Sequence, residues 1–200
     1  MIHAICCDLE GVFVPEVWIN VAKKTGIEEL KLTTRDINDY DVLMKKRLGI
    51  LKEHGLKLID IQNIIATLEP LEGAVDFLYW LKEKSRVFIV SDTFSEFADP
   101  LMKKLGRPTL FCNYLSVDKD NNVTDYHLRQ PDQKRMVVKA LQSLNYRIIA
   151  FGDSYNDISM LQQAEQGILY CPPANVIEDY PQFPVTGNYN ELKARIEEYL

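Results

Sequence analysis

The sequence predicts an α/β fold: a doubly wound, mostly parallel sheet with a small all-helical cap inserted after the first strand. Two observations carry this prediction. Short apolar runs at residues 2–7, 87–90, 147–151 and 167–171 alternate with stretches that have the helical period. About 55 residues without a strand period, residues 15–70, lie between the first run and the next βα unit, far more than a plain crossover between parallel strands requires.

The first apolar run, residues 2–7, is predicted to be a buried parallel strand whose carboxyl end carries Asp8. Ligands of open α/β sheets bind at that end of the strands. Glu10 and Gly11 follow, so two carboxylates can face one crevice, where a hard cation such as Mg²⁺ would offset their repulsion. Taken alone, the stretch is better explained by a capping acid beside a solvated one.

Helical spacing replaces the strand period between residues 15 and 70. Apolar side chains recur at intervals of three and four residues over 16–24, 41–52 and 58–68, which predicts three short amphipathic helices. We expect residues 15–70 to form a cap over the carboxyl ends of the strands, and residues 1–14 and 71–200 to form the core.

The α/β alternation returns after residue 71. The strand over 87–90 ends in Ser91-Asp92-Thr93, and the strand over 147–151 ends in Gly152-Asp153. Residues 110–117 and 123–128 flank an Asp- and Asn-rich turn, which indicates a hairpin. Helices are predicted over residues 73–84, 131–144, 156–164, 174–180 and 190–200, with a further helix ending at Leu105 and a candidate edge strand at 185–186.

Length and composition restrict the function classes. The chain has 200 residues, 46% of them hydrophobic, and a formal net charge of −6, which suits one ordinary domain and gives no basic field for nucleic acid or an anionic membrane. No apolar run approaches the roughly 18 residues of a membrane span and no secretory signal is evident, so we expect a cytoplasmic protein. Reduced core thiols are expected at Cys6, Cys7, Cys112 and Cys171.

Polar side chains follow several predicted strands at the edge where their carboxyl ends meet. Asp153 and Asp157 are four residues apart, which places one carboxylate in the turn after a strand and the other in the first turn of the next helix. Each candidate has a simpler explanation by itself: Ser91 or Asp157 could begin a helix, and Lys134 could be a surface lysine. The converging candidates are Asp8, Glu10, Ser91, Thr93, Lys134, Asp153 and Asp157.

Together these stretches resemble the haloacid dehalogenase superfamily of aspartate-nucleophile phosphohydrolases. Residues 152–160 are similar to the last motif of its phosphoserine phosphatase branch, and residues 40–51 with 68–73 are similar to the cap helix and return of that branch. Two departures are Glu10, where the branch carries Asp, and Ser91-Asp92-Thr93, where it carries a Ser-Gly-Gly type. Residues 8–12, 33–37 and 91–94 are most similar to the bifunctional members, which also transfer the phosphoryl group to homoserine.

The resemblance implies catalysis through an aspartyl-phosphate. Asp8 is the implied nucleophile toward O-phosphoserine, and Glu10 the acid for the departing serine oxygen and then the base for the incoming acceptor. Lys134 and the Ser91 hydroxyl would hold the non-transferring phosphoryl oxygens. Mg²⁺ is the implied cofactor, with Asp8, Asp153 and the main-chain carbonyl of Glu10 as ligands and Asp157 supporting its waters.

The resemblance also implies residues that bind the amino acid. Arg47 matches the carboxylate-binding arginine of the branch, and Glu16 matches the acid that pairs with the substrate ammonium. Arg47 could instead belong with Lys45 and Lys46 to a solvated helix face. Further implied substrate contacts are Ser91, Asp92, Thr93 and Asn156. The expected partners are small molecules, O-phosphoserine and homoserine, and a second copy of the chain in a homodimer.

Glu10 has one methylene more than Asp, which moves its carboxylate about one C–C bond further out. We hypothesise that this position favours transfer to an alcohol over hydrolysis by water.

Two other functions remain open. Another small-molecule phosphatase of the same superfamily would share the core motifs and differ in the cap. A receiver-type phospho-accepting domain would share the sheet, the aspartate, Mg²⁺, a Ser or Thr and a Lys, but it needs no cap.

Overall fold

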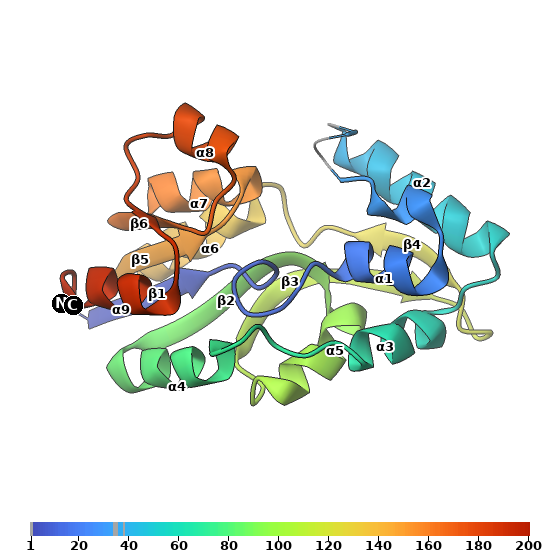
Figure 1. Cartoon of the computed structure of the whole chain (residues 1–200), viewed down its shortest axis with the longest axis horizontal. Coiled ribbons are helices and arrows are strands. Elements are labelled where there is room, and N and C mark those ends of the chain that lie inside the picture. The colour runs from blue at the N-terminus through green and yellow to red at the C-terminus, as the bar shows by residue number, and fades with distance from the viewer. Residues whose placement is uncertain (1, 34–35, 38) are drawn as a thin grey trace.

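A twisted, mostly parallel sheet forms the centre of the computed structural model, which describes residues 2–33, 36–37 and 39–200. Within these residues, seven strands lie in the order β4-β3-β2-β1-β5-β6-β7, and every neighbouring pair is parallel except β3 and β4 (Figure 1). The predicted fold class is therefore confirmed. The strands are β1 (Ile2–Cys7), β2 (Arg86–Phe94), β3 (Thr109–Val117), β4 (Val123–His127), β5 (Tyr146–Gly152), β6 (Gln166–Tyr170) and β7 (Val185–Thr186).

The helices connect the strands and cover both faces of the sheet. None of them, within the ranges described, is long and apolar enough to cross a membrane. The helices are α1 (Val17–Thr25), α2 (Tyr40–Glu53), α3 (Leu58–Ala66), α4 (Ala74–Lys84), α5 (Ser95–Lys104), α6 (Gln133–Ser143), α7 (Ile158–Gln163), α8 (Ala174–Asp179) and α9 (Tyr189–Glu197), with two 3₁₀ turns, η1 (Glu28–Lys31) and η2 (Tyr155–Asp157).

The central strand β1 separates two apolar layers, because successive side chains of a strand point to opposite faces. Ile5 and Cys7 pack in the layer that contains buried side chains of α4, α5 and α9. Ala4 and Cys6 pack in the layer formed with α6, α7 and α8. Since β1 pairs with β2 on one side and β5 on the other, the residue that follows it, Asp8, lies at the middle of the sheet edge.

Helices α1, α2 and α3 lie at one end of the molecule, beside β4 and α5, while α7 and α8 lie at the other (Figure 1). The three predicted helices of residues 15–70 are confirmed, and the short turn η1 was not predicted. Buried side chains of α1 and α3, such as Val21 and Ile61, share one apolar layer with α4 and α5. Tyr40 ties α2 to the core, since its hydroxyl donates to the Asp92 carbonyl at 3.5 Å.

Three local predictions need correction. Strand β2 continues through Phe94, and its pairing with β3 shifts register between Val90 and Phe94. The helix predicted over 156–164 is divided into η2 and α7. Cys171 is an exposed thiol and Cys112 is half-buried, so only Cys6 and Cys7 are core thiols. Cys171 lies in the turn after β6, outside the buried strand, with a left-handed backbone (φ 47°).

Candidate active site

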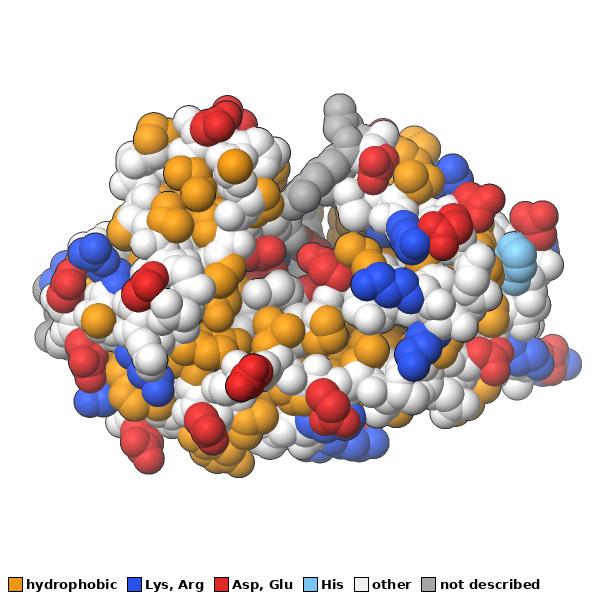
Figure 2. All heavy atoms as spheres, in the orientation of Figure 1, with side chains coloured by type: hydrophobic (Ala, Val, Ile, Leu, Met, Phe, Trp, Pro, Cys, Tyr) orange, Lys and Arg blue, Asp and Glu red, His pale blue; other side chains and the backbone are white. Residues whose placement is uncertain are grey.

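A pocket of about 230 Å³ opens at the carboxyl ends of β1, β2 and β5. In the space-filling view it lies in a notch between the lobe with α7 and α8 and the lobe with α1 and α2, and acidic side chains lie at its floor (Figure 2). Its polar lining comes from Asp8, Glu10, Glu16, Thr33, Tyr40, Arg47, Ser91, Asp92, Thr93, Asp153, Ser154, Tyr155 and Asn156.

Asp8 is fixed at the floor of this pocket by its own backbone and by the turn that follows. Its N–H donates to the Phe151 carbonyl at 3.1 Å, so β5 holds it in place. Gly11 has a left-handed backbone (φ 75°), and a Cβ there would lie 2.5 Å from a carboxylate oxygen of Asp153. The glycine therefore permits both the turn and the close approach of Asp153 to it.

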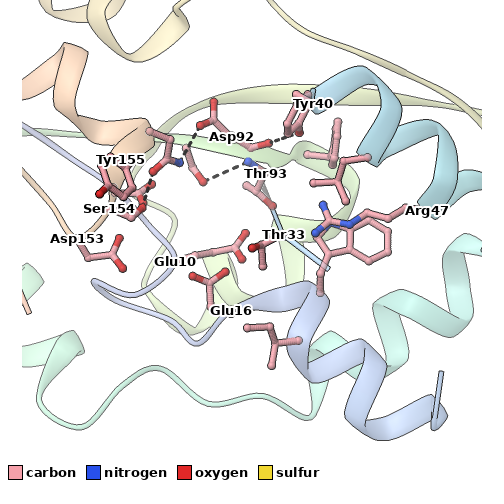
Figure 3. A pocket seen from close by; sticks show the side chains of 17 residues that line it. Glu10, Glu16, Thr33, Tyr40, Arg47, Asp92, Thr93, Asp153, Ser154 and Tyr155 are labelled. Carbon is pink, nitrogen blue, oxygen red and sulfur yellow. Dashed lines mark hydrogen bonds between the residues drawn. The ribbon is translucent and has the colours of Figure 1, made fainter. Parts of the chain in front are cut away.

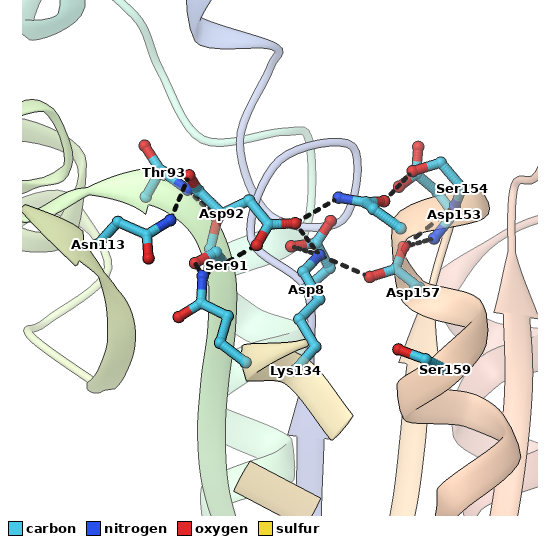
Figure 4. A network of polar contacts seen from close by, with 12 residues as sticks. Asp8, Ser91, Asp92, Thr93, Asn113, Lys134, Asp153, Ser154, Asp157 and Ser159 are labelled. Atoms are coloured by element: carbon cyan, nitrogen blue, oxygen red, sulfur yellow. Dashed lines mark hydrogen bonds and ion pairs between the residues drawn. The ribbon is translucent and has the colours of Figure 1, made fainter. Parts of the chain in front are cut away.

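Lys134 is buried among carboxylates, with 2% of its surface exposed. Its Nζ lies 2.9 Å from Asp8 Oδ1, 2.7 Å from Asp157 Oδ1 and 3.8 Å from Asp92 Oδ2 (Figure 4). Burial would lower the pKa of Lys134, but Asp157, Asp8 and Asp92 outweigh it and raise the pKa well above its ordinary value. The alternative of a solvated surface lysine is wrong.

Asp157 is the fully buried partner that organises the loop after β5. Its Oδ2 accepts from the N–H groups of Asp153 and Ser154 at 3.0 and 3.1 Å, while its Oδ1 accepts from Lys134. A Cβ on Gly152 would lie 2.2 Å from the Asp157 carboxyl carbon, so only glycine leaves room for this arrangement. Asp157 therefore shapes the loop besides belonging to the acidic cluster.

Asp8, Asp153 and Asp157 form a carboxylate cluster in which one oxygen of each lies within 4.8 Å of the others. Burial, followed by the charge of Asp157, raises the pKa of Asp8 well above its usual range, and the same two causes raise that of Asp153 to about 7. One lysine cannot balance three ionised carboxylates. An all-oxygen donor set with excess negative charge fits a hard divalent cation.

The end of β2 places Ser91, Asp92 and Thr93 along one wall. The buried Ser91 hydroxyl accepts from the Thr93 N–H at 3.3 Å, and helix α5 begins only at Ser95, so the alternative that Ser91 caps that helix is wrong. Asp92 accepts from Asn156 Nδ2 at 3.0 Å and from Gln133 Nε2 at 2.9 Å (Figure 4).

Glu10 and Glu16 present their carboxylates to the pocket from the segment that leads into α1 (Figure 3). Glu10 is half-buried, and its Oε2 accepts from the Val17 N–H at 2.8 Å. Burial and then the neighbouring Glu16 raise the pKa of Glu10 to about 8. Glu16 is exposed at the N-cap position of α1 and makes no capping hydrogen bond there.

Arg47 enters the pocket from α2 and is 7% exposed. Its Nη2 donates to the Leu32 carbonyl at 2.8 Å, and its guanidinium lies 4.6 Å from the centre of the Trp18 ring. Its buried Nε has no hydrogen-bond partner among the described residues. Lys45 and Lys46 are exposed, so the solvated-face explanation applies to them and is wrong for Arg47.

Comparison with known proteins agrees with this geometry. A family model described as haloacid dehalogenase-like hydrolase matches residues 2–165. The chain belongs to this family. It is 61% identical to phosphoserine phosphatase ThrH of Pseudomonas aeruginosa over 94% of this chain and 92% of that protein. It is 60% identical to a phosphoserine phosphatase of Pseudomonas syringae pv. tomato over 96% and 81%.

Solved structures of phosphoserine phosphatases share the fold. A phosphoserine phosphatase in apo form superposes with a TM-score of 0.78 at 23% identity and covers 98% of both chains. The family match identifies a hydrolase, so the alternative of a receiver-type phospho-accepting domain is wrong.

The structure of this haloacid dehalogenase-like hydrolase brings nearly all predicted site residues to one pocket or its floor. Of the segment 33–37 that carried part of the resemblance, Thr34 and Arg35 lie outside the described residues. Two buried amides were not predicted. Gln133 donates to the Ser91 carbonyl at 2.9 Å, and Asn113 donates to the Asp92 carbonyl at 3.1 Å. Gln133 could have been suspected from the sequence because it stands beside Lys134 at a helix start. Nothing in the sequence marks Asn113, which lies within a strand.

Proposed function

We propose that this protein is a Mg²⁺-dependent phosphoserine phosphatase that also transfers the phosphoryl group to homoserine. One observation carries the proposal: the pocket that contains Asp8 also contains a buried Arg47, whose Nε has no partner in the part of the chain that the structure describes, and the paired carboxylates of Glu10 and Glu16. A cationic group, an anionic pair and a nucleophile in one small pocket match the carboxylate, ammonium and phosphoryl groups of a phosphorylated amino acid. The 61% identity to a phosphoserine phosphatase supports the same substrate.

The acidic cluster is suited to Mg²⁺ because its ligand atoms are oxygens and its negative charge exceeds the single positive charge of Lys134. Asp8, Asp153 and the main-chain carbonyl of Glu10 would hold the ion, and Asp157 would support its waters. When bound, Mg²⁺ supplies positive charge that neutralises the phosphoryl oxygens and favours an in-line transfer.

In the first half-reaction, a carboxylate oxygen of Asp8 attacks phosphorus and the bond from phosphorus to the serine oxygen breaks. Glu10 gives its proton to the departing serine oxygen, which leaves as the alcohol. Lys134 and the Ser91 hydroxyl hold the non-transferring oxygens. Asp8 is then an aspartyl-phosphate and Glu10 is ionised.

In the second half-reaction, Glu10 takes a proton from the incoming acceptor, whose oxygen attacks phosphorus. The bond from phosphorus to the Asp8 oxygen breaks, which regenerates both carboxyl groups. With water as the acceptor the product is inorganic phosphate, and with homoserine it is O-phosphohomoserine. The second half-reaction alone decides between the two activities.

Substrate recognition is assigned to the helical segment. Residues 15–70 act as a cap on the core of residues 1–14 and 71–200, with Arg47 binding the substrate carboxylate and Glu16 the ammonium. Asp92, Thr93 and Asn156 line the side of the same pocket and contact the amino acid or the phosphoryl group. A cytoplasmic location and a homodimer remain predictions.

The test is ³¹P NMR of the purified protein with Mg²⁺ and L-phosphoserine, with and without L-homoserine. We expect inorganic phosphate in both tubes and a second phosphomonoester signal only with homoserine. Inorganic phosphate alone would reduce the function to a phosphatase. An unchanged phosphoserine signal in both tubes, with turnover of a sugar phosphate or nucleotide, would assign another small-molecule substrate.

A further inference from the structure

Glu10 is attached to the first turn of α1, a contact that its role as an acid does not require. Its Oε2 accepts from the N–H of Val17, the first residue of that helix, at 2.8 Å. The first N–H groups of a helix lack partners within the helix, and the N-cap side chain often supplies one. Here the N-cap residue Glu16 makes no such bond, so Glu10 provides the acceptor from outside the helix.

The same turn also contacts the residue proposed to bind the substrate carboxylate. Trp18 follows Val17, and the Arg47 guanidinium lies 4.6 Å from the centre of its ring. Trp18 also packs edge-on against Phe97 of α5, with ring centres 5.4 Å apart. Three consecutive residues therefore contribute to the site: Glu16 lines the pocket, Val17 holds Glu10, and Trp18 supports Arg47.

We infer that the first turn of α1 positions Glu10 for proton transfer through the Val17 N–H, and thereby fixes the acid–base group relative to the amino acid held by Arg47 and Glu16. The inference rests on the proposed function. Val17 is in this sense a positioning residue, since its backbone acts through Glu10 and contacts no reacting atom. The expected effect is confined to steps in which a proton moves to or from an alcohol or water oxygen.

The length of the side chain at position 10 is what makes the contact. An aspartate would hold its carboxylate back by about one C–C bond, too far for a hydrogen bond to an N–H that glutamate reaches at 2.8 Å. The Val17 N–H keeps its hydrogen during catalysis, so Glu10 Oε2 always accepts a hydrogen bond from it. The proton that Glu10 transfers is therefore carried by its other oxygen, Oε1. One oxygen thus orients the group while the other performs the chemistry.

Val17→Pro removes this hydrogen bond with little other change. Proline is favoured at the first position of a helix because no intrahelical partner is lost there. The preceding residue, Glu16, has φ −55° and ψ 117°, outside the helical region that a following proline disfavours. Val17→Ala is the matched control, since it trims the same buried side chain and keeps the N–H.

The readout compares two substrates through kcat/KM, which covers the steps up to phosphoryl transfer to Asp8. The serine alkoxide is a poor leaving group that needs a proton, whereas p-nitrophenolate leaves without one. We expect kcat/KM for phosphoserine to be about 10-fold lower in Val17→Pro than in Val17→Ala. For p-nitrophenyl phosphate, kcat/KM of the two variants should differ by less than about two-fold. Equal losses on both substrates, or equal behaviour of the two variants, would overturn the inference.

A double-mutant cycle with Glu10→Asp gives an independent measurement. Since the aspartate does not reach Val17, adding Val17→Pro to Glu10→Asp should cause no further loss on phosphoserine relative to Val17→Ala in the same background. A full additional 10-fold loss there would show that proline acts by another route. If Val17→Pro does not fold, α-hydroxyvaline at position 17 removes the N–H and keeps the side chain, with the same expected results.

Failure of the proposed function would be distinguishable from failure of this inference. Wild-type protein that leaves phosphoserine unchanged would overturn both. If the wild type hydrolyses phosphoserine but Val17→Pro loses activity equally on phosphoserine and p-nitrophenyl phosphate, only the positioning role of α1 would be overturned.

Discussion

The two ends of the pocket are built in different ways. At the end proposed to bind the phosphoryl group (the phosphoryl end), the carboxylates of Asp8 and Asp157 both contact the buried Lys134, and the Asp157 carboxylate also accepts two backbone N–H groups. At the end proposed to bind the amino acid (the amino-acid end), Arg47 is buried beside Trp18 with its Nε unpartnered among the described residues. The first end is held by protein contacts, and the second retains hydrogen-bonding capacity for a ligand.

This difference separates the chemistry from the choice of substrate. A phosphoryl group presents the same oxygens in every substrate, so a rigid arrangement at the ends of β1 and β5 serves it well. Under the proposed function an amino acid or an acceptor must enter and leave, and the residues proposed to contact it, Glu16 and Arg47, lie at the start of α1 and on α2. Substitutions at the phosphoryl end should therefore affect all substrates alike, while those at the amino-acid end should affect them selectively.

Asp8→Asn should produce the largest effect. Without the nucleophile no aspartyl-phosphate forms, and turnover of phosphoserine and p-nitrophenyl phosphate should both fall by about 10⁴-fold or more. Removing one of three clustered carboxylates lowers their repulsion, so the melting temperature in EDTA should not fall below that of the wild type. Asp120→Asn, at an exposed turn residue, is the control, and residual phosphoenzyme in Asp8→Asn would exclude Asp8 as nucleophile.

Lys134→Met should reduce both activity and stability. The buried carboxylates of Asp8 and Asp157 lose their counter-charge, which costs about 3–5 kcal/mol of unfolding free energy, and activity should fall about 10²–10³-fold on every substrate. Urea unfolding in EDTA measures the first effect, and added Mg²⁺ should restore part of it. Lys139→Met, an exposed site on the same helix, is the control; equal stability of the two variants would contradict the prediction.

Arg47→Ala should separate substrates. Loss of a charge-assisted contact with the substrate carboxylate is expected to raise KM for phosphoserine about 10–100-fold, equivalent to about 1.4–2.7 kcal/mol, with little change for p-nitrophenyl phosphate, which has no such group. Steady-state kinetics on the two substrates measures this selectivity. Lys46→Ala, on the exposed face of α2, should change neither, and a parallel loss on both substrates in Arg47→Ala would indicate a structural role.

The phosphoryl end was the more predictable of the two from sequence. Apolar runs that end in Asp8, Ser91 and Asp153 define strand ends locally, and parallel topology brings those ends to one edge. The helical spacing of Arg47 with the apolar Leu43 and Leu51 indicates an inward position, and all three are buried. These features depend on short-range periodicity.

Contacts between distant segments were not predictable in this way. Gln133 and Asn113 hold the end of β2 with buried amides whose partners lie 42 and 21 residues away. An isolated glutamine or asparagine in the sequence carries no sign of such a partner. The hydrogen bond from Val17 to Glu10 joins residues only seven apart in the sequence. It was not predictable either, because it depends on the turn at Gly11 and on where α1 starts, and periodicity locates neither to one residue.

The change in product ratio expected for Glu10→Asp is the smallest of these effects and the most specific one. The shorter side chain withdraws the base from an alcohol acceptor and leaves space that water can occupy. We therefore expect the ratio of hydrolysis to transfer to rise by a few-fold, measured as inorganic phosphate against phosphohomoserine in ³¹P NMR at fixed homoserine. Because both products arise from the same aspartyl-phosphate, a general loss of activity cancels in this ratio. An unchanged ratio would mean that the extra methylene of Glu10 serves only to reach Val17, and that the choice of acceptor lies with Arg47 and Glu16 instead.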